Sequence, residues 1–259
     1  MTAEESPATR WSLAFLNRAI ELGLRHVVVS PGSRSRALAL AAYYLEENSP
    51  DGLQVHVAID ERTAGFLGLG LAVESGQLVA LICTSGSAPA HYLPALMEAK
   101  HSGIPLIALT ADRPVELRGV GANQTTDQVG MFGSAVHSSI DVAAPVKDER
   151  LSEQARSYAR EAVALSLSGA ADGRPGPVQL NIAFREPLSS AISSQEMNLL
   201  LQPGGVSSHE PTSPQSPRVV TLNPEPGTVV IAGHRAGPEA ESLATDLGAP
   251  LFAEVHSGA

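Results

Sequence analysis

Short apolar stretches alternate with longer segments of helical periodicity along the first 188 residues of the chain. The stretches are partly β-branched and apolar along both faces, which is typical of strands in a parallel sheet covered by helices. They predict six strands, at His26–Ser30, Gln54–Ile59, Leu78–Thr84, Pro105–Ala111, Ser139–Ala144 and Pro177–Ile182. The segments between them predict five helices, at Thr9–Leu22, Ser35–Glu47, Glu61–Glu74, Pro89–Lys100 and Ser152–Ser168. This alternation predicts an α/β fold with a doubly wound, mostly parallel sheet.

The pattern changes after residue 188. Residues 189–217 are rich in Ser, Pro and Gln and lack sustained periodicity, so we interpret them as a linker. Residues 218–259 then predict a strand, a helix and a strand, at Thr228–Ala232, Pro238–Leu247 and Pro250–Glu254. Three elements cannot bury the faces of a sheet by themselves. We therefore expect a whole domain over residues 1–188 and an incomplete, Rossmann-like second domain over 218–259, in a natural protein that continues past Ala259.

Composition narrows the class of protein. A formal net charge of −10 argues against a nucleic-acid partner, because neutralising phosphates requires clustered Lys and Arg. The single cysteine, Cys83, lies in an apolar stretch and is interpreted as a buried core residue rather than a reactive thiol. No stretch reaches the roughly 18 apolar residues that span a bilayer, and Met1–Pro7 lacks the apolar core of a signal peptide. We expect a soluble, cytoplasmic protein without a membrane span.

Candidate chemistry follows the carboxyl ends of the strands, where open α/β sheets bind ligands. The segment after the first strand, Ser30–Arg36, combines small residues with Arg34 and Arg36 at a helix start. Exposed amides and guanidinium groups at such a position suit a carboxylate or a phosphate. An ordinary capped helix with arginines facing solvent is the alternative.

The segment after the second strand places Glu61 at the start of a helix. Acidic residues are common there because of the helix dipole. The same helix contains Gly65, Gly68 and Gly70, each of which costs about 1 kcal/mol relative to Ala in a helix interior. We expect a ligand or another subunit to approach this backbone closely, so that Glu61 lies at a crowded junction where it acts as an acid.

Two further loops complete the candidate site. Thr84–Ser87 is a polar turn that resembles a phosphate-binding loop only weakly, and Ser87 as a helix N-cap explains it without a ligand. After the fourth strand, Pro114 restricts Arg113 to an extended conformation. The connection then continues through Gly121–Thr125 and is unusually long for its type. The four loops together predict a binding site for a polyanionic organic substrate.

Five spaced motifs closely resemble the 2-succinyl-5-enolpyruvyl-6-hydroxy-3-cyclohexene-1-carboxylate synthase family, the thiamine diphosphate enzymes of menaquinone biosynthesis. The motifs are Val29–Ser35, Asp60–Arg62, Thr84–Ala88, Thr110–Pro114 and Gly121–Thr125. Pro177–Leu188 resembles the end of the family's first domain, so the resemblance covers roughly residues 10–190. It implies that residues 1–188 form the pyrimidine-binding domain and that the tail begins the central domain.

The resemblance also implies an activity. Glu61 matches the catalytic glutamate that hydrogen-bonds the aminopyrimidine ring of thiamine diphosphate and thereby helps to create its carbon nucleophile. The family decarboxylates 2-oxoglutarate and adds the remaining carbanion to isochorismate, and both substrates carry two carboxylates. The implied substrate ligands are Ser33, Arg34, Arg113, Asn123 and Gln124. The implied cofactor contacts are Pro31, Glu61, Thr84, Ser85 and His91.

The sequence departs from the family pattern in three places. His91 stands where the family usually has Asn, and Arg36 replaces a smaller polar residue, so Arg36 is assigned no role. The motif that binds diphosphate and Mg²⁺ or Mn²⁺, Gly-Asp-Gly followed much later by Asn, does not occur. We therefore assign no metal ligand, and expect a missing C-terminal domain to hold the metal and the cofactor. This chain alone should be inactive. The family architecture implies a homo-oligomer, a dimer or tetramer, with its active site between subunits.

Two alternatives stay open. Another thiamine diphosphate decarboxylase or carboligase, such as a relative of acetolactate synthase, shares a glutamate like Glu61 but does not need arginines in both loops. A non-catalytic α/β scaffold that kept the fold and lost the chemistry is the other. The pair Arg34 and Arg113 favours the synthase.

Overall fold

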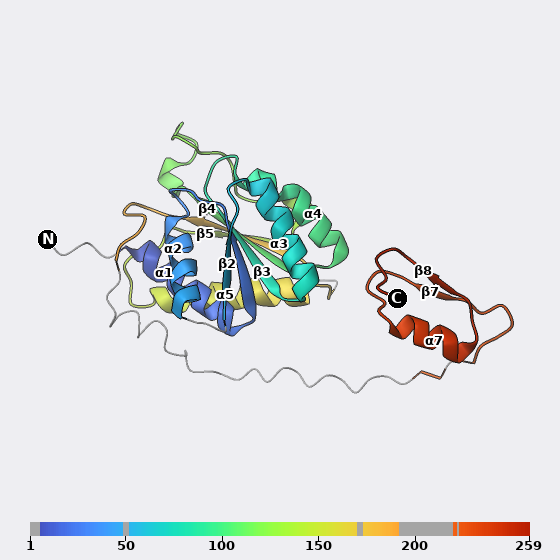
Figure 1. Ribbon diagram of the computed structural model, residues 1–259. Coiled ribbons are helices and arrows are strands. Elements are labelled where there is room, and N and C mark those ends of the chain that lie inside the picture. The colour runs from blue at the N-terminus through green and yellow to red at the C-terminus, as the bar shows by residue number, and fades with distance from the viewer. Residues whose placement is uncertain (1–5, 49–51, 170–172, 192–219, 222) are drawn as a thin grey trace. The chain divides into compact units, whose positions relative to one another are not determined.

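The computed structural model describes residues 6–48, 52–169, 173–191, 220–221 and 223–259 (Figure 1). Contacts along the chain divide it into two compact units, Met1–Pro203 and Gly204–Ala259. The division falls outside the described residues, as does most of the predicted linker 189–217. The limits of the two domains therefore stay predictions, and each unit is considered by itself.

The first unit contains one six-stranded sheet in the order β2-β1-β3-β4-β6-β5. Its strands are β1 (Leu24–Val29), β2 (Gln54–Val57), β3 (Leu78–Cys83), β4 (Leu106–Asp112), β5 (Ser138–Val142) and β6 (Pro177–Ala183). All neighbouring strands pair in parallel. Each predicted strand overlaps one of these, so the doubly wound parallel sheet is confirmed.

The prediction that every strand is apolar and covered on both faces is wrong for the two edges. In β2 no residue is fully buried, and Val57 and, just beyond the strand, Ile59 are 67% and 86% exposed. In β5 exposed and partly buried positions alternate up to the buried Val142. An edge strand has a neighbour on one side only, and here the flanking helices leave much of its surface open. The four central strands are buried almost throughout.

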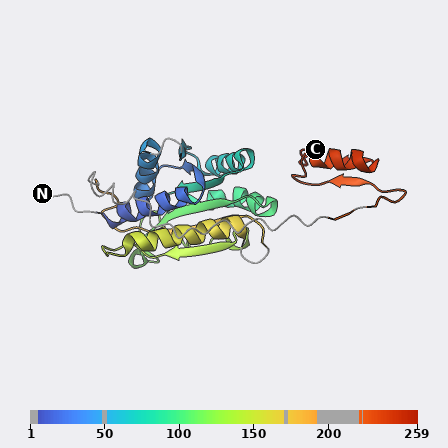
Figure 2. The ribbon, with the colours of Figure 1, turned by 90° about the horizontal axis from the view of Figure 1, so that it is seen from below.

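Helices cover both faces of the sheet (Figure 2). One buried apolar cluster joins the sheet to α1 (Pro7–Glu21), α2 (Arg36–Asn48) and α5 (Leu151–Ser168), and a second joins it to α3 (Glu61–Ser75) and α4 (Leu93–Ser102). The predicted helix Pro89–Lys100 is divided into a 3₁₀ turn, η1 (Pro89–Tyr92), and α4. Pro94 lies in the first turn of α4, where backbone N–H groups make no hydrogen bond within the helix, so its missing N–H costs nothing. The α-helix therefore begins at Leu93.

The glycines of α3 have a different cause from the predicted one. A Cβ on Gly68 would lie 2.4 Å from Leu81 Cδ2, and one on Gly65 would lie 3.1 Å from Ala95 Cβ. Both glycines therefore let α3 pack against its own domain, and the prediction of an approaching ligand or subunit is wrong for them. Only Gly70 faces open space.

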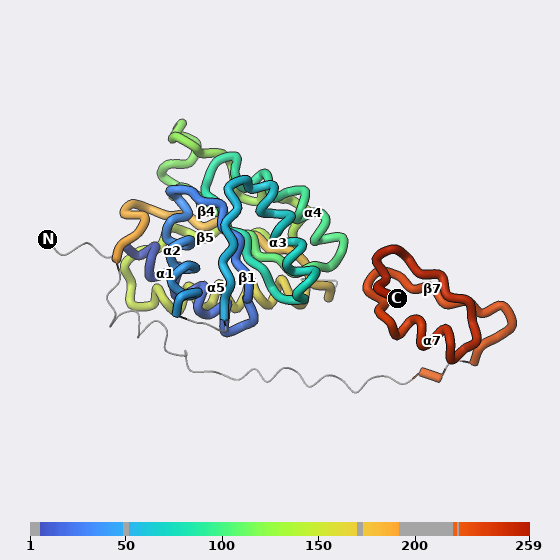
Figure 3. The backbone as a smooth tube through the Cα atoms, in the orientation of Figure 1, coloured from blue at the N-terminus to red at the C-terminus, as the bar shows by residue number. Residues whose placement is uncertain are grey.

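The chain order places a switch point between β1 and β3 at the carboxyl edge of the sheet. From β1 the chain passes to β2 on one side, and from β3 it continues to β4 on the other, so the connections after β1 and β3 lead in opposite directions. The connection from β4 to β5, drawn in green in Figure 3, extends beyond this edge and contains the short turns η2 (Val115–Leu117) and η3 (Gly133–Ala135).

The second unit contains β7 (Val230–Ala232), α7 (Glu239–Leu247) and β8 (Leu251–Ala253), with β7 and β8 paired in parallel. This is the strand, helix and strand predicted for residues 228–254. Ile231 and Phe252 remain largely exposed on the two-stranded sheet. In the described parts of both units, no helix is long and apolar enough to cross a membrane.

Candidate functional site

The turn after β1 packs tightly on the end of β3. A Cβ on Gly32 would lie 2.3 Å from the Cβ of Thr84, so only glycine allows this approach. Ser35 Oγ donates a hydrogen bond to the carbonyl of Gly32 at 3.2 Å, which closes the turn ahead of α2. Pro31 and Ser33 remain exposed on its outer side, and no hydrogen bond joins the Ser33 side chain to another described residue.

Arg34 reaches from this turn toward the end of β6. Its Nη1 donates to the carbonyl of Phe184 at 2.9 Å and lies 3.7 Å from Glu186 Oε1. Burial lowers the pKa of Arg34, and the neighbouring charge of Arg113 lowers it further, against opposing effects of Glu186 and Asp112. The N–H of Phe184 in turn donates to the carbonyl of Asp112, the residue before Arg113, so Arg34 and Arg113 lie near each other at this edge. Two guanidinium groups that repel each other favour an anion between them.

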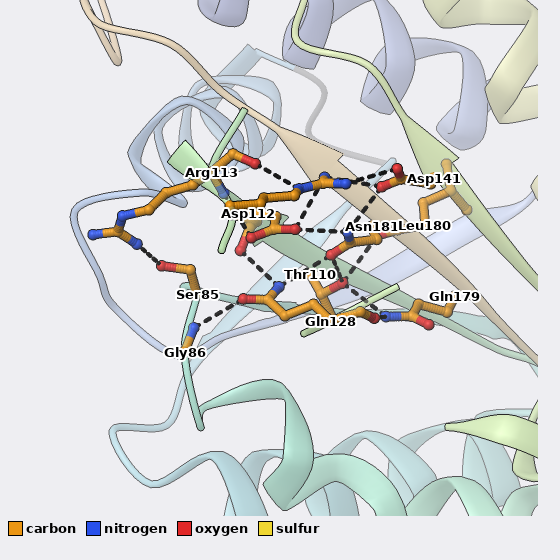
Figure 4. A network of polar contacts seen from close by, with 12 residues as sticks. Ser85, Gly86, Thr110, Asp112, Arg113, Gln128, Asp141, Gln179, Leu180 and Asn181 are labelled. Atoms are coloured by element: carbon orange, nitrogen blue, oxygen red, sulfur yellow. Dashed lines mark hydrogen bonds and ion pairs between the residues drawn. The ribbon is translucent and has the colours of Figure 1, made fainter. Parts of the chain in front are cut away.

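Arg113 is 9% exposed and joins two loops (Figure 4). Its Nη1 donates to Ser85 Oγ and, at 2.6 Å, to the carbonyl of Gln124. Ser85 Oγ donates to that carbonyl as well, and Gln124 Nε2 returns a hydrogen bond to the carbonyl of Ser85. Three predicted site residues thus form one cluster. Asn123 lies beside them on the exposed side of the loop, and its side chain makes no hydrogen bond with a described residue.

A network of charged side chains extends from the buried Asp112, the residue before Arg113, to the more exposed Arg118 and Asp141. The carboxylate of Asp112 accepts hydrogen bonds from the backbone N–H of Arg113 and from Asn181 Nδ2, and it pairs with Arg118 at 3.0 Å. Arg118 also makes two hydrogen bonds to Asp141, which accepts a further one from Asn181. Burial raises the pKa of Asp141, but the hydrogen bonds from Arg118 and Asn181 outweigh it and the net shift is downward. The network fixes the start of the loop that carries Arg113.

Sequence reasoning missed Asn181, Asp141 and Gln128, which hold this loop from within the domain. Asn181 and Asp141 lie on β6 and β5, and Gln128 is a fully buried residue near the end of the long loop. Two polar residues inside β6, Gln179 and Asn181, were the available signal, because an apolar central strand tolerates a buried polar side chain only with a partner.

Glu61 occupies a separate corner of the same edge. It is the first residue of α3, and the preceding Asp60 caps the helix by accepting the N–H of Thr63 at 2.8 Å. That hydrogen bond is the main reason why the pKa of Asp60 is lowered. Glu61 is half-buried, and its carboxylate makes no hydrogen bond or ion pair with a described residue. Burial raises the pKa of Cys83 and Tyr92, and the charge of Glu61 adds to both shifts.

The surroundings of Glu61 are apolar on one side and open on the other. Cys83 is fully buried, which confirms its interpretation as a core residue. The hydroxyl of Tyr92 is also buried, with Ser30 and Cys83 beside it, yet it has no hydrogen bond of ordinary geometry. His91 is exposed on η1, and its charge contributes slightly to the lowered pKa of Asp60. The described residues contain no group of three or more His, Cys, Asp or Glu side chains that could hold a metal ion.

Comparisons with known proteins find similar sequences among thiamine pyrophosphate enzymes. The family described as "Thiamine pyrophosphate enzyme, N-terminal TPP binding domain" matches residues 12–131. The 2-succinyl-5-enolpyruvyl-6-hydroxy-3-cyclohexene-1-carboxylate synthase of Leifsonia xyli is 47% identical over 253 residues, which cover 98% of this chain and 42% of that protein. The synthase of Clavibacter michiganensis is 52% identical over 188 residues, or 72% of this chain and 30% of the relative. That of Nocardioides is 41% identical over 263 residues, covering 100% and 42%. The chain spans less than half the length of these relatives.

Proposed function

We propose that the chain belongs to the thiamine pyrophosphate enzymes and is the N-terminal part of a 2-succinyl-5-enolpyruvyl-6-hydroxy-3-cyclohexene-1-carboxylate synthase. The proposed reaction decarboxylates 2-oxoglutarate and joins the remaining four-carbon unit to isochorismate, as a step toward menaquinone. The observation that carries the substrate assignment is that hydrogen bonds to backbone carbonyls hold Arg34 against Phe184 and Phe184 against Asp112, next to the anchored Arg113, at the carboxyl edge of the sheet.

The corner around Glu61 fits the aminopyrimidine end of thiamine diphosphate. A carboxylate without a partner among the described residues stands beside the buried, unpaired hydroxyl of Tyr92. When bound, thiamine diphosphate supplies the carbon nucleophile that cleavage of a 2-oxo acid requires. Glu61 would hold a proton at a ring nitrogen of the pyrimidine, and the apolar wall formed by Cys83 would keep water from that contact. Pro31, Thr84, Ser85 and His91 are the other proposed cofactor contacts.

The arginine pair would bind the carboxylates of the two substrates. Both proposed substrates carry two carboxylates, and a guanidinium group binds such a group through two parallel hydrogen bonds. Arg34 and Arg113 are already held in place by backbone carbonyls, so little side-chain freedom is lost on binding. The further proposed substrate ligands are Ser33, Asn123 and Gln124, which lie on the same two loops.

The metal and the diphosphate would be bound by the part of the protein that this chain does not span. Mg²⁺ or Mn²⁺ needs oxygen ligands such as carboxylates, and this proposal assigns none of them to the present residues. On this view the chain alone is inactive and supplies only the pyrimidine and substrate side of the site.

We also propose a homo-oligomer, a dimer or tetramer, with each site formed between subunits in the cytoplasm. Phe66, Leu67 and Val73 on α3 are exposed, and the first two line a hollow with Arg62 and Thr63. This apolar surface adjoins Glu61, so a second subunit bound there would cover the open side of the Glu61 carboxylate. Light scattering of the full-length protein tests the oligomer, and a monomer that remains active would contradict it.

The function is tested by adding 2-oxoglutarate and isochorismate to the full-length protein with thiamine diphosphate and Mg²⁺. We expect release of carbon dioxide together with the joined product, identified by its mass. Decarboxylation without joining to isochorismate would indicate another enzyme of the family. No turnover of either substrate by a folded protein would favour a non-catalytic scaffold.

A further inference from the structure

The side chain of Gln128 connects three separate parts of the carboxyl edge although it touches no proposed ligand-binding side chain. It is 1% exposed. Its Oε1 accepts the backbone N–H of Gly86 at 2.9 Å, and its Nε2 donates to the carbonyl of Ala111 and to Asn181 Oδ1. Figure 4 shows this side chain between the turn after β3 and the ends of β4 and β6.

The atoms that Gln128 holds are the immediate neighbours of the arginine cluster. Gly86 follows Ser85, whose hydroxyl accepts a hydrogen bond from Arg113. Gly86 has φ +88, and a Cβ there would lie 2.9 Å from Gln124 Cγ, so the turn and the long loop are in close contact. Ala111 precedes the pair Asp112–Arg113 at the end of β4.

The backbone around Gln124 depends on these attachments. Gln124 itself has φ +51, a left-handed conformation that costs a non-glycine residue free energy and persists only where its surroundings enforce it. Its carbonyl accepts from both Ser85 and Arg113. Gln128 lies four residues further along, and its own carbonyl accepts from Gln179 Nε2, so the loop is anchored on both sides of its bend.

We propose that Gln128 is a positioning residue, which sets the register between the turn after β3 and the loop after β4 and thereby aims Arg113 and Gln124 at the substrate carboxylates. The inference rests on the proposed function of these two residues. Gln128 acts through Gly86 and the carbonyl of Ala111, and it does not touch the substrate. Its side-chain amide pairs with one buried donor, the N–H of Gly86, and with two acceptors, the carbonyl of Ala111 and Asn181 Oδ1, of which Asn181 Oδ1 also accepts from Thr110.

The test uses the full-length protein and Gln128→Met, which has a similar length but no hydrogen bonds. We expect the KM for 2-oxoglutarate or isochorismate to rise about tenfold, because an arginine displaced by a fraction of an ångström loses its two-point contact, while kcat changes less. KM does not depend on the fraction of protein that is folded. If Gln128→Met does not fold, Gln128→Glu should raise KM in the same way. Its second carboxylate oxygen would replace Nε2 and would face the carbonyl of Ala111 and Asn181 Oδ1, which are both acceptors.

Two controls separate positioning from stability. Thr110→Val removes hydrogen bonds from the same buried network, those of Thr110 Oγ1 with Leu180, Asn181 and Gln179, but removes none of the hydrogen bonds that Gln128 makes to Gly86, Ala111 and Asn181. It should lower the melting temperature with an unchanged KM. In combination with Arg113→Lys, Gln128→Met should raise KM little further, because both changes act on the same contact.

Each outcome decides the inference. An unchanged KM in both Gln128 variants, or effects of Gln128→Met and Arg113→Lys that multiply fully, would overturn the positioning role while leaving the proposed function intact. A wild-type protein that converts neither substrate would remove the proposed function and this inference together.

Discussion

The two corners of the carboxyl edge are built in opposite ways. We use "arginine corner" for Arg34, Ser85, Arg113, Gln124 and Gln128, and "acid corner" for Glu61 with Cys83, His91 and Tyr92. In the arginine corner every charged group is held by hydrogen bonds to neighbouring loops. In the acid corner the Glu61 carboxylate and the Tyr92 hydroxyl have no such partner among the described residues.

The difference indicates which chemical group of a ligand each corner would bind. The arginine corner is organised before any ligand binds, which is the arrangement expected for recognising the fixed geometry of carboxylates. The acid corner carries a carboxylate beside an apolar wall, and that carboxylate is free to contact a ligand on its open side. In the proposed enzyme that ligand group is the aminopyrimidine ring, delivered to the open side of Glu61.

The largest effect is expected at Glu61. In the full-length protein Glu61→Gln keeps the shape but removes the acid, so hydrogen–deuterium exchange at the thiazolium carbon should slow by a factor on the order of 10² to 10⁴. Glu74→Gln, an exposed change near the other end of α3, is the matched control and should leave the exchange rate unchanged. An exchange rate in Glu61→Gln equal to that of the wild type would show that the acid corner plays no part in activating the cofactor.

A smaller effect is expected in the arginine corner. Arg113→Lys keeps the charge but loses the planar fork that bridges Ser85, Gln124 and a carboxylate, so KM for at least one substrate should rise roughly 30-fold. Exchange at the thiazolium carbon should change far less, which distinguishes the two corners. Arg160→Lys on the outer face of α5 is the control. Unchanged KM values for both substrates would sink the assignment of Arg113 as a ligand.

Substitutions in α3, which carries Glu61, test whether this helix packs on β3 through its glycines. Gly68→Ala forces a Cβ against Leu81 and should lower the free energy of unfolding by about 1–3 kcal/mol. Gly70→Ala, two residues away in open space, should raise it by up to about 1 kcal/mol through helix propensity alone. Urea unfolding followed by circular dichroism measures both. Equal changes in the two variants would mean that α3 is not packed on β3 as described.

Sequence patterns predicted the elements and placed the loops of Arg34 and Arg113 at one edge of the sheet, because parallel strands bring their carboxyl ends to the same edge whatever the details of packing. They could not predict Gln128, since its partners Gly86 and Asn181 lie 42 and 53 residues away and no local period marks them. The same limit explains the error at Gly65 and Gly68. A helical glycine signals close approach of some group, but the sequence does not say whether that group belongs to β3, to a ligand or to another subunit.

The smallest effect concerns the outer rim of the arginine corner, where Arg185 after β6 makes two hydrogen bonds to Glu116 in η2. These bonds lower the pKa of Glu116 from 4.5 to about 2. A carboxyl whose pKa is lower in the folded state stabilises the fold above about pH 4.5, and this contribution is lost as the pH falls toward 2. Glu116→Gln should therefore reduce the fall in melting temperature between pH 5.5 and pH 3, whereas Glu149→Gln, an exposed control, should not. The change in melting temperature should be small because solvent screens the pair Glu116–Arg185. An identical pH dependence in Glu116→Gln and the wild type would show that the ion pair does not stabilise this rim, in contrast to the hydrogen-bonded arginines of the arginine corner.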